Sequence, residues 1–95
     1  MIMEEIRTLL LENALDALDR LFDSECRAID IYVLTYATGC ALSGDILQPL
    51  FHESAEALQN LAHKNLPAKD LREKALEVTD DLRIALADAL PWPPS

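Results

Sequence analysis

Apolar side chains recur at steps of three and four positions from residue 2 to residue 22. Two neighbouring lines of a helix collect them: Ile6, Leu10, Ala17 and Leu21 on one, and Leu11, Leu15, Leu18 and Phe22 on the other. This period of 3.6 residues predicts an amphipathic helix whose broad apolar face packs against the rest of the domain.

The opposite side of this predicted helix is acidic. Its carboxylates recur at steps of seven, four, three and four, which stacks them along one side: Glu5, Glu12, Asp16, Asp19 and Asp23. Like charges at this spacing repel by roughly 0.2–0.5 kcal/mol per pair, and Arg20 offsets only part of the repulsion. The face therefore either keeps the protein soluble or binds a basic partner, and we expect these five residues to form the partner-binding site.

Residues 26–37 are apolar on nearly every side. A helix with this pattern is typical of a central, buried element, and Asp23 or Ser24 would cap its start. Residues 28–38 are also rich in β-branched and aromatic side chains, which suit a strand, so helix and strand both stay open. The helix is favoured because a lone strand would have no partner elsewhere in this chain.

Asp30 lies inside this apolar stretch, where a carboxylate is costly unless it is paired or hydrogen-bonded. A structural ion pair with Arg27, or a position that faces solvent, is favoured over a functional role.

A loop over residues 38–44 is expected before a third helix, which extends to about Lys64. Asp45 and Gln48 resemble a capping box in which Asp replaces Ser or Thr. Pro49 falls in the first turn of this helix, where proline costs least.

Asn65 suits the left-handed position that ends a helix, and Pro67 is typical of the first residue of the next one. The fourth predicted helix runs to about residue 90, because Pro91 excludes the helical conformation from the residue before it. Residues 1–90 are thus predicted to form one helical domain, with a proline-rich tail at 91–95. Trp92 in this tail either folds back onto the core, which is favoured, or docks on a partner.

These segments predict an all-α fold, a compact arrangement of about four helices joined by short loops. The alternative is a helical unit that completes its core by forming a homodimer through the apolar second segment. Five leucines are expected in the core: Leu15, Leu18, Leu58, Leu82 and Leu86.

Charge narrows the classes of partner. The 95 residues include 17 acids and 8 bases, for a net charge of −9, which would repel both nucleic acid and an anionic membrane. Cys26 and Cys40 lack the spacing of a metal or redox motif, and the first residues lack the basic region of a secretory signal. We therefore expect a cytoplasmic protein with two reduced, buried cysteines and no membrane span.

Candidate catalytic and metal-binding residues are few. His52, Glu56 and His63 could share one face of the third helix, but the zinc-protease motif needs a second histidine where Glu56 stands. An exposed polar face is the favoured interpretation, so no metal or cofactor is expected. No local signature marks either cysteine as a nucleophile, and we expect a protein that is not an enzyme.

The short acidic chain and its helix with Glu5, Glu12, Asp16, Asp19 and Asp23 resemble the small cytosolic immunity proteins that bacteria carry against their own secreted toxins. The resemblance is one of kind and transfers no motif. It implies a protein that binds a basic toxin, often a nuclease, and covers the active site of that toxin. The competing expectation is a homodimeric structural or adaptor domain of the helical-bundle type.

Overall fold

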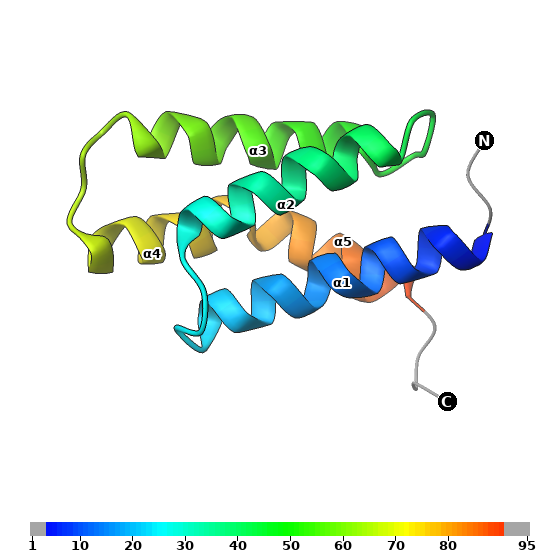
Figure 1. The fold of residues 1–95 in the computed structure, drawn as a ribbon, viewed down its shortest axis with the longest axis horizontal. Coiled ribbons are helices and arrows are strands. Elements are labelled where there is room, and N and C mark those ends of the chain that lie inside the picture. Colours follow the sequence, from blue (N-terminus) through cyan, green and yellow to red (C-terminus); the bar gives the residue numbers. More distant parts are fainter. Residues whose placement is uncertain (1–3, 91–95) are drawn as a thin grey trace.

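The computed structural model describes residues 4–90, where helices joined by turns are the regular secondary structure and strands are absent (Figure 1). The helices are α1 (Glu4–Phe22), α2 (Ala28–Ala41), α3 (Gln48–Ala62), α4 (Ala68–Val78) and α5 (Asp80–Ala89). The all-α prediction is confirmed, and the second apolar segment is a helix rather than a strand. Trp92 and the tail at 91–95 lie outside the described residues.

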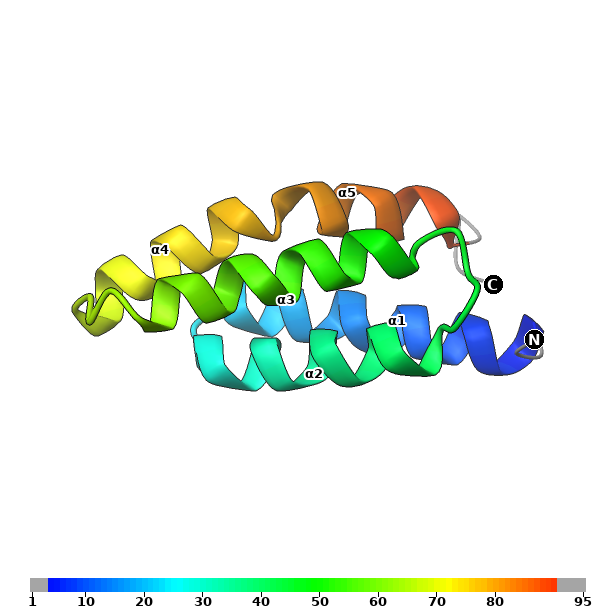
Figure 2. The same ribbon diagram turned by 90° about the horizontal axis from the view of Figure 1, so that it is seen from above.

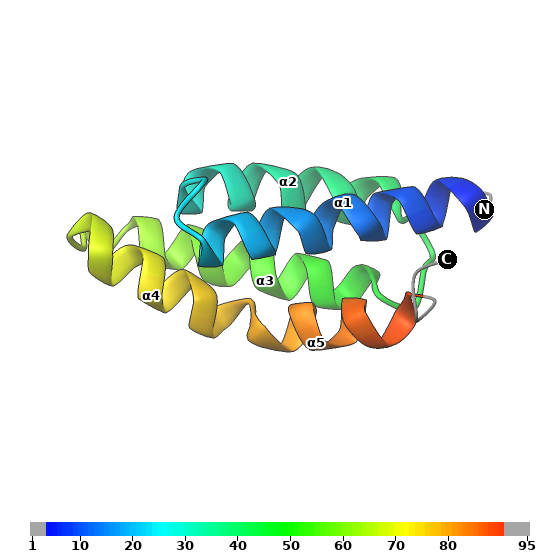
Figure 3. The same ribbon diagram turned by 90° about the horizontal axis from the view of Figure 1, so that it is seen from below.

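The helices form a bundle in which α4 and α5 together take the place of the expected fourth helix. α2 and α3 are antiparallel neighbours, α1 packs beside α2, and the bent α4–α5 pair closes the bundle against α1 and α3 (Figures 1 and 2). α2 and α5 do not contact each other and lie on opposite sides of the bundle (Figure 3). The shape is elongated, with extents of 39 × 26 × 17 Å.

The division between α4 and α5 occurs at Thr79, inside the segment predicted to form one long helix. Its buried hydroxyl donates a hydrogen bond to the carbonyl oxygen of Ala75 at 2.7 Å, and its backbone has φ −100° and ψ 1°. A threonine hydroxyl that bonds to the carbonyl four residues earlier often bends a helix, although Thr35 makes the same bond to Ile31 within the undivided α2. The backbone bonds from Thr79 to Ala75 and from Arg83 to Thr79 persist, so the chain bends without unwinding.

Four of the five predicted core leucines are buried: Leu18, Leu58, Leu82 and Leu86. Leu15 was predicted to be buried but is only half-buried, because it lies at the edge where α1 meets α5. Ile6 and Phe22 were also expected on the inward face, yet both are exposed, because they lie near the two ends of α1.

The prediction that α2 is a central, buried helix is wrong. It is a surface helix, and it buries only one side: Ile31, Thr35, Thr38 and Gly39. Each helix of so small a bundle keeps a side facing solvent, so the outward side of α2 leaves apolar side chains exposed.

The start of α2 also differs from the expectation that Asp23 or Ser24 caps it. Arg27 occupies the N-cap position, and its backbone N–H donates to Oδ2 of Asp30 at 2.9 Å. The Arg27 guanidinium lies 3.5 Å from the same carboxylate. The backbone hydrogen bond from Arg27, together with the Arg27 side chain, lowers the pKa of Asp30. Asp30 is exposed and paired with Arg27, which agrees with the structural ion pair that was favoured over a functional role.

The loop between α2 and α3 begins later than predicted, since residues 38–41 still belong to α2. Asp45 and Gln48 do make capping contacts, but not as a capping box. Asp45 Oδ1 accepts the N–H of Leu47, and Gln48 Oε1 accepts that of Gly44. Pro49 lies in the first turn of α3, as expected.

The two cysteines are unpaired, but the prediction that both are buried is wrong for Cys40, which is exposed. Cys26 is half-buried, and this burial raises the pKa of its thiol. Asn65 takes the predicted left-handed conformation, with φ 51°. Across residues 4–90, each helix is too short or too polar to cross a membrane.

Candidate functional site

The five carboxylates predicted to bind a partner are all exposed. Glu5, Glu12, Asp16 and Asp19 project from the solvent side of α1, and Asp23 follows one residue beyond its end. The apolar side of α1 faces the core, so the row of carboxylates on its opposite side is accessible to a partner.

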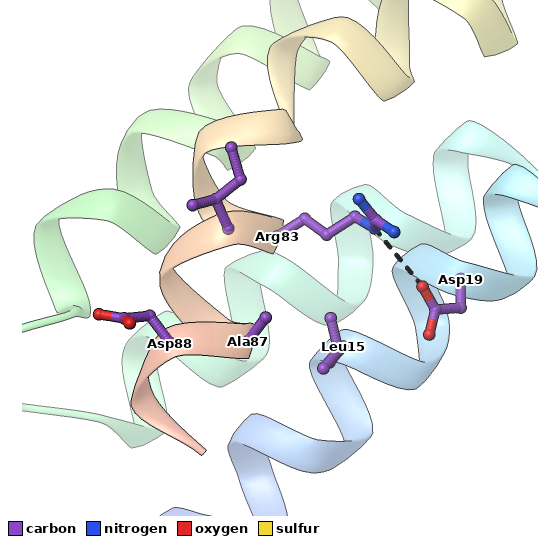
Figure 4. Close-up of a pocket in the computed structure, with 6 residues that line it drawn as sticks. Leu15, Asp19, Arg83, Ala87 and Asp88 are labelled. Carbon is purple, nitrogen blue, oxygen red and sulfur yellow. Dashed lines mark ion pairs between the residues drawn. The ribbon is translucent and has the colours of Figure 1, made fainter. Parts of the chain in front are cut away.

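Two arginines neutralise part of this surface. Arg20 lies 3.1 Å from Asp16, one turn away on α1, and Arg83 reaches across from α5 to within 3.5 Å of Asp19 (Figure 4). All four side chains are more than half exposed, and ion pairs of this kind contribute only about 0–1 kcal/mol. Such pairs can exchange readily for contacts with an incoming cation.

The contribution of α5 to this surface was not predicted from the sequence. Asp80, Asp81 and Asp88 are exposed on α5, which packs beside α1. The two helices together carry more carboxylates than cations: Glu4, Glu5, Glu12, Asp16, Asp19, Asp80, Asp81 and Asp88 against Arg7, Arg20 and Arg83. The spacing of Asp81 and Asp88, two turns apart, could have signalled an acidic side of α5 but not its place next to α1.

A hollow of about 490 Å³ lies between α1 and α5, lined by Leu15, Asp19, Arg83, Ile84, Ala87 and Asp88. Leu15 and Ala87 face each other across it, while Arg83 extends toward Asp19 (Figure 4). Asp88 projects from the far side of α5 (Figure 4). The hollow is therefore apolar at its centre and charged at its edges.

A second hollow of about 320 Å³ continues past Arg83, where α1 meets the bend between α4 and α5. Its lining residues are Leu18, Phe22, Leu76, Glu77, Thr79, Asp80 and Arg83. Phe22 is 63% exposed there, although it is a large apolar side chain. The two hollows share Arg83, and we refer to them together as the acid-rimmed groove.

The groove offers carboxylate oxygens and apolar surface. Carboxylates accept hydrogen bonds from Lys and Arg, and exposed leucine, isoleucine and phenylalanine side chains gain from being covered. This chemistry suits recognition of a basic, partly apolar surface.

The histidines contribute nothing to the groove. His52, Glu56 and His63 are exposed on or just after α3, which is a different side of the bundle. Within residues 4–90, no three or more His, Cys, Asp or Glu side chains are grouped as a metal ion would require.

Comparison of the chain with protein-family models, with curated proteins and with solved structures found no match.

Proposed function

We propose that this protein is a non-enzymatic binding domain that recognises a basic protein through the acid-rimmed groove. One observation carries the proposal. The exposed carboxylates of α1 lie beside those of α5, and the surface between the two helices is hollowed and apolar.

The groove favours a partner segment that is both basic and amphipathic. Its apolar side chains would cover Leu15 in one hollow and Phe22 in the other. Its lysines or arginines would meet the surrounding carboxylates, Asp19 and Asp80 among them. Complementary charge of this kind raises the association rate and makes it strongly dependent on salt.

The partner class that we propose is a basic toxin of the nuclease type, which makes this chain an immunity protein of the cytoplasm. A nuclease needs cationic side chains to hold the phosphates of its substrate. The same cations would pair with the carboxylates of α1, so binding would occlude the nuclease active site. The resemblance to immunity proteins noted above supports this assignment.

The experiment begins with affinity capture of the partner from native cells, followed by binding measurements at low and high salt. The double variant Asp16→Asn/Asp19→Asn should weaken binding about tenfold or more and reduce the salt dependence. The matched control is Glu53→Gln/Glu56→Gln, which removes the same charge from exposed positions on α3. Equal loss in both double variants would show that only net charge matters and would reject the groove as the binding site.

Arg83 provides a variant with the opposite expected sign. Because its guanidinium lies 3.5 Å from Asp19, it competes with any cation of the partner for that carboxylate. Arg83→Ala should therefore strengthen binding of a basic partner, severalfold at low salt and less at high salt. Weaker binding by this variant would mean that Arg83 itself contacts the partner and that the charge argument is wrong.

A further inference from the structure

The outward side of α2 carries an apolar row that no element of residues 4–90 covers. Ile29, Val33 and Tyr36 are 49%, 58% and 54% exposed, and Cys40 is also exposed. The four positions follow one another at steps of four, three and four. This alternation is the spacing with which one helix packs along another.

Charge distinguishes this side from the rest of the surface. Asp30 is the single charged residue among the 14 of α2. The chain as a whole has a net charge of −9, so two copies that approach through α1 and α5 would repel each other. The outward side of α2 is where two copies can meet with few carboxylates between them.

The spacing of the row also suits a second copy. Steps of four, three and four are the same in both directions, so the row matches itself when one helix is reversed. A two-fold antiparallel pair would place Ile29 against Cys40 of the other copy and Val33 against its Tyr36. Such a contact is self-complementary, as a closed two-fold dimer requires.

The position of Asp30 is compatible with the antiparallel arrangement, because it lies about 100° around the helix from Ile29, to one side of the row. In the antiparallel pair the two Asp30 carboxylates are separated by about 13 Å along the helix axis, given a rise of about 1.5 Å per residue. That distance exceeds the screening length of about 8 Å at physiological salt, so the repulsion is small.

We propose that a second copy of this chain packs antiparallel on the row formed by Ile29, Val33, Tyr36 and Cys40, giving a homodimer. The three largest side chains, each about half exposed, supply roughly 300 Å² of apolar surface per copy. Two copies together would bury about 600 Å² of this row, roughly half the area of the smaller specific interfaces, so the contact is a weak one. The dimer therefore dissociates on dilution.

This dimer is independent of the proposed function but compatible with it. Because α2 and α5 lie on opposite sides of the bundle, pairing through α2 leaves the acid-rimmed groove of each copy open (Figures 2 and 3). The dimer would present two grooves to partners, and a bivalent partner would bind it more tightly than it binds a monomer.

Sedimentation over a range of concentrations tests the oligomeric state. The purified protein should shift from its monomer mass of 10.6 kDa to twice that mass as concentration rises. Val33→Glu should abolish the shift while leaving the circular dichroism spectrum unchanged, because Val33 faces solvent. The control is Ile46→Glu, which makes the same kind of change at a side chain that is 86% exposed in the loop between α2 and α3. A protein that stays monomeric at high concentration, or equal loss of dimer in both variants, would overturn the proposal.

Cysteine crosslinking tests the arrangement. In a Cys26→Ser background, Ile29→Cys should give a covalent dimer on mild oxidation, because position 29 faces Cys40 of the other copy. The two positions in one chain are about 16 Å apart along the helix and cannot bridge internally. The background without Ile29→Cys should give little covalent dimer. Efficient crosslinking through Cys40 alone would overturn the antiparallel arrangement.

Discussion

Arg7, at the end of the first turn of α1, forms an ion pair with Asp45, which lies in the loop between α2 and α3. The two side chains are 20% and 8% exposed, far less than those of the other ion pairs in residues 4–90. Asp45 also accepts the N–H of Leu47 at 2.9 Å, so one carboxylate joins α1 to the turn that begins α3. This contact holds one end of the bundle together.

Replacing Asp45 should make stability less dependent on pH. The hydrogen bond from Arg7 holds the pKa of Asp45 below its usual value. The stabilisation is therefore present above the unfolded-state pKa of about 3.9, and it is lost as pH falls through the lower pKa of the folded state. Asp45→Asn should reduce the free energy of unfolding by about 1–3 kcal/mol at pH 7 and by less at pH 3.

Urea titration at the two pH values measures this difference. Asp16→Asn is the control, because the Asp16–Arg20 pair is exposed and should contribute only about 0–1 kcal/mol. If Asp45→Asn lowered the free energy of unfolding equally at pH 3 and pH 7, the result would argue against an ionic role for Asp45.

Gly39 is expected to respond to alanine in the opposite way from an ordinary helical glycine. Gly→Ala inside a helix normally stabilises by about 0.5–1 kcal/mol. A Cβ at position 39, however, would lie 3.1 Å from Cβ of the buried Phe51, where α2 and α3 approach closely. Phe51 cannot relieve this contact by rotating its ring, so Gly39→Ala should destabilise the protein by about 1–3 kcal/mol.

The control for this prediction is Ala37→Gly, at an exposed position of the same helix. It should cost about 1 kcal/mol through helix propensity alone. If Gly39→Ala instead raised the free energy of unfolding by as much as Ala37→Gly lowers it, helix propensity would outweigh the close approach to Phe51. That result would mean that α3 shifts to make room for the added methyl group.

The sequence predicted which segments are helical but not how α2 is placed. Its apolar residues on every side suggested a central helix, whereas a bundle of short helices has no position that is enclosed on all sides. The bend at Thr79 could not be predicted from the sequence either. A threonine hydroxyl can bond to a helix carbonyl without bending the chain far enough to divide the helix. Both features depend on how the helices pack, which periodicity within one segment does not contain.

Truncation to alanine should lower stability more at the buried leucines than at Leu15. Leu18→Ala should cost about 2–5 kcal/mol because it opens a cavity beneath α1. Leu15 is half-buried at the acid-rimmed groove, so Leu15→Ala should cost about 1 kcal/mol and should mainly weaken partner binding. Denaturant midpoints for the two variants give the comparison, and equal midpoints would contradict the assignment of Leu15 to the surface.

The candidate site was predictable only where it lies on one helix. The spacing of Glu12, Asp16 and Asp19 correctly predicted that they share the exposed side of α1. The ion pair between Asp19 and Arg83 joins positions 64 residues apart, and the groove exists only because α5 lies beside α1. No pattern along the chain could indicate that contact.

Glu12 gives the sharpest separation of stability from binding. It forms no ion pair among residues 4–90, and it lies one turn before Asp16 and two turns before Asp19. The carboxylate of Glu12 therefore repels those of Asp16 and Asp19. Glu12→Lys replaces this repulsion with an attraction to the same two carboxylates, and Lys and Glu have nearly equal helix propensity. The variant should stabilise the free protein by about 0.3–1 kcal/mol at low salt. The gain should shrink as salt screens the charges.

The Glu12→Lys variant should also weaken binding of a basic partner more than Glu12→Gln does, since it places a cation among the carboxylates. Thermal unfolding at two salt concentrations, together with binding to the captured partner, measures both effects. A loss of stability in Glu12→Lys would show that repulsion does not act along this face, and unchanged binding would remove Glu12 from the proposed interface.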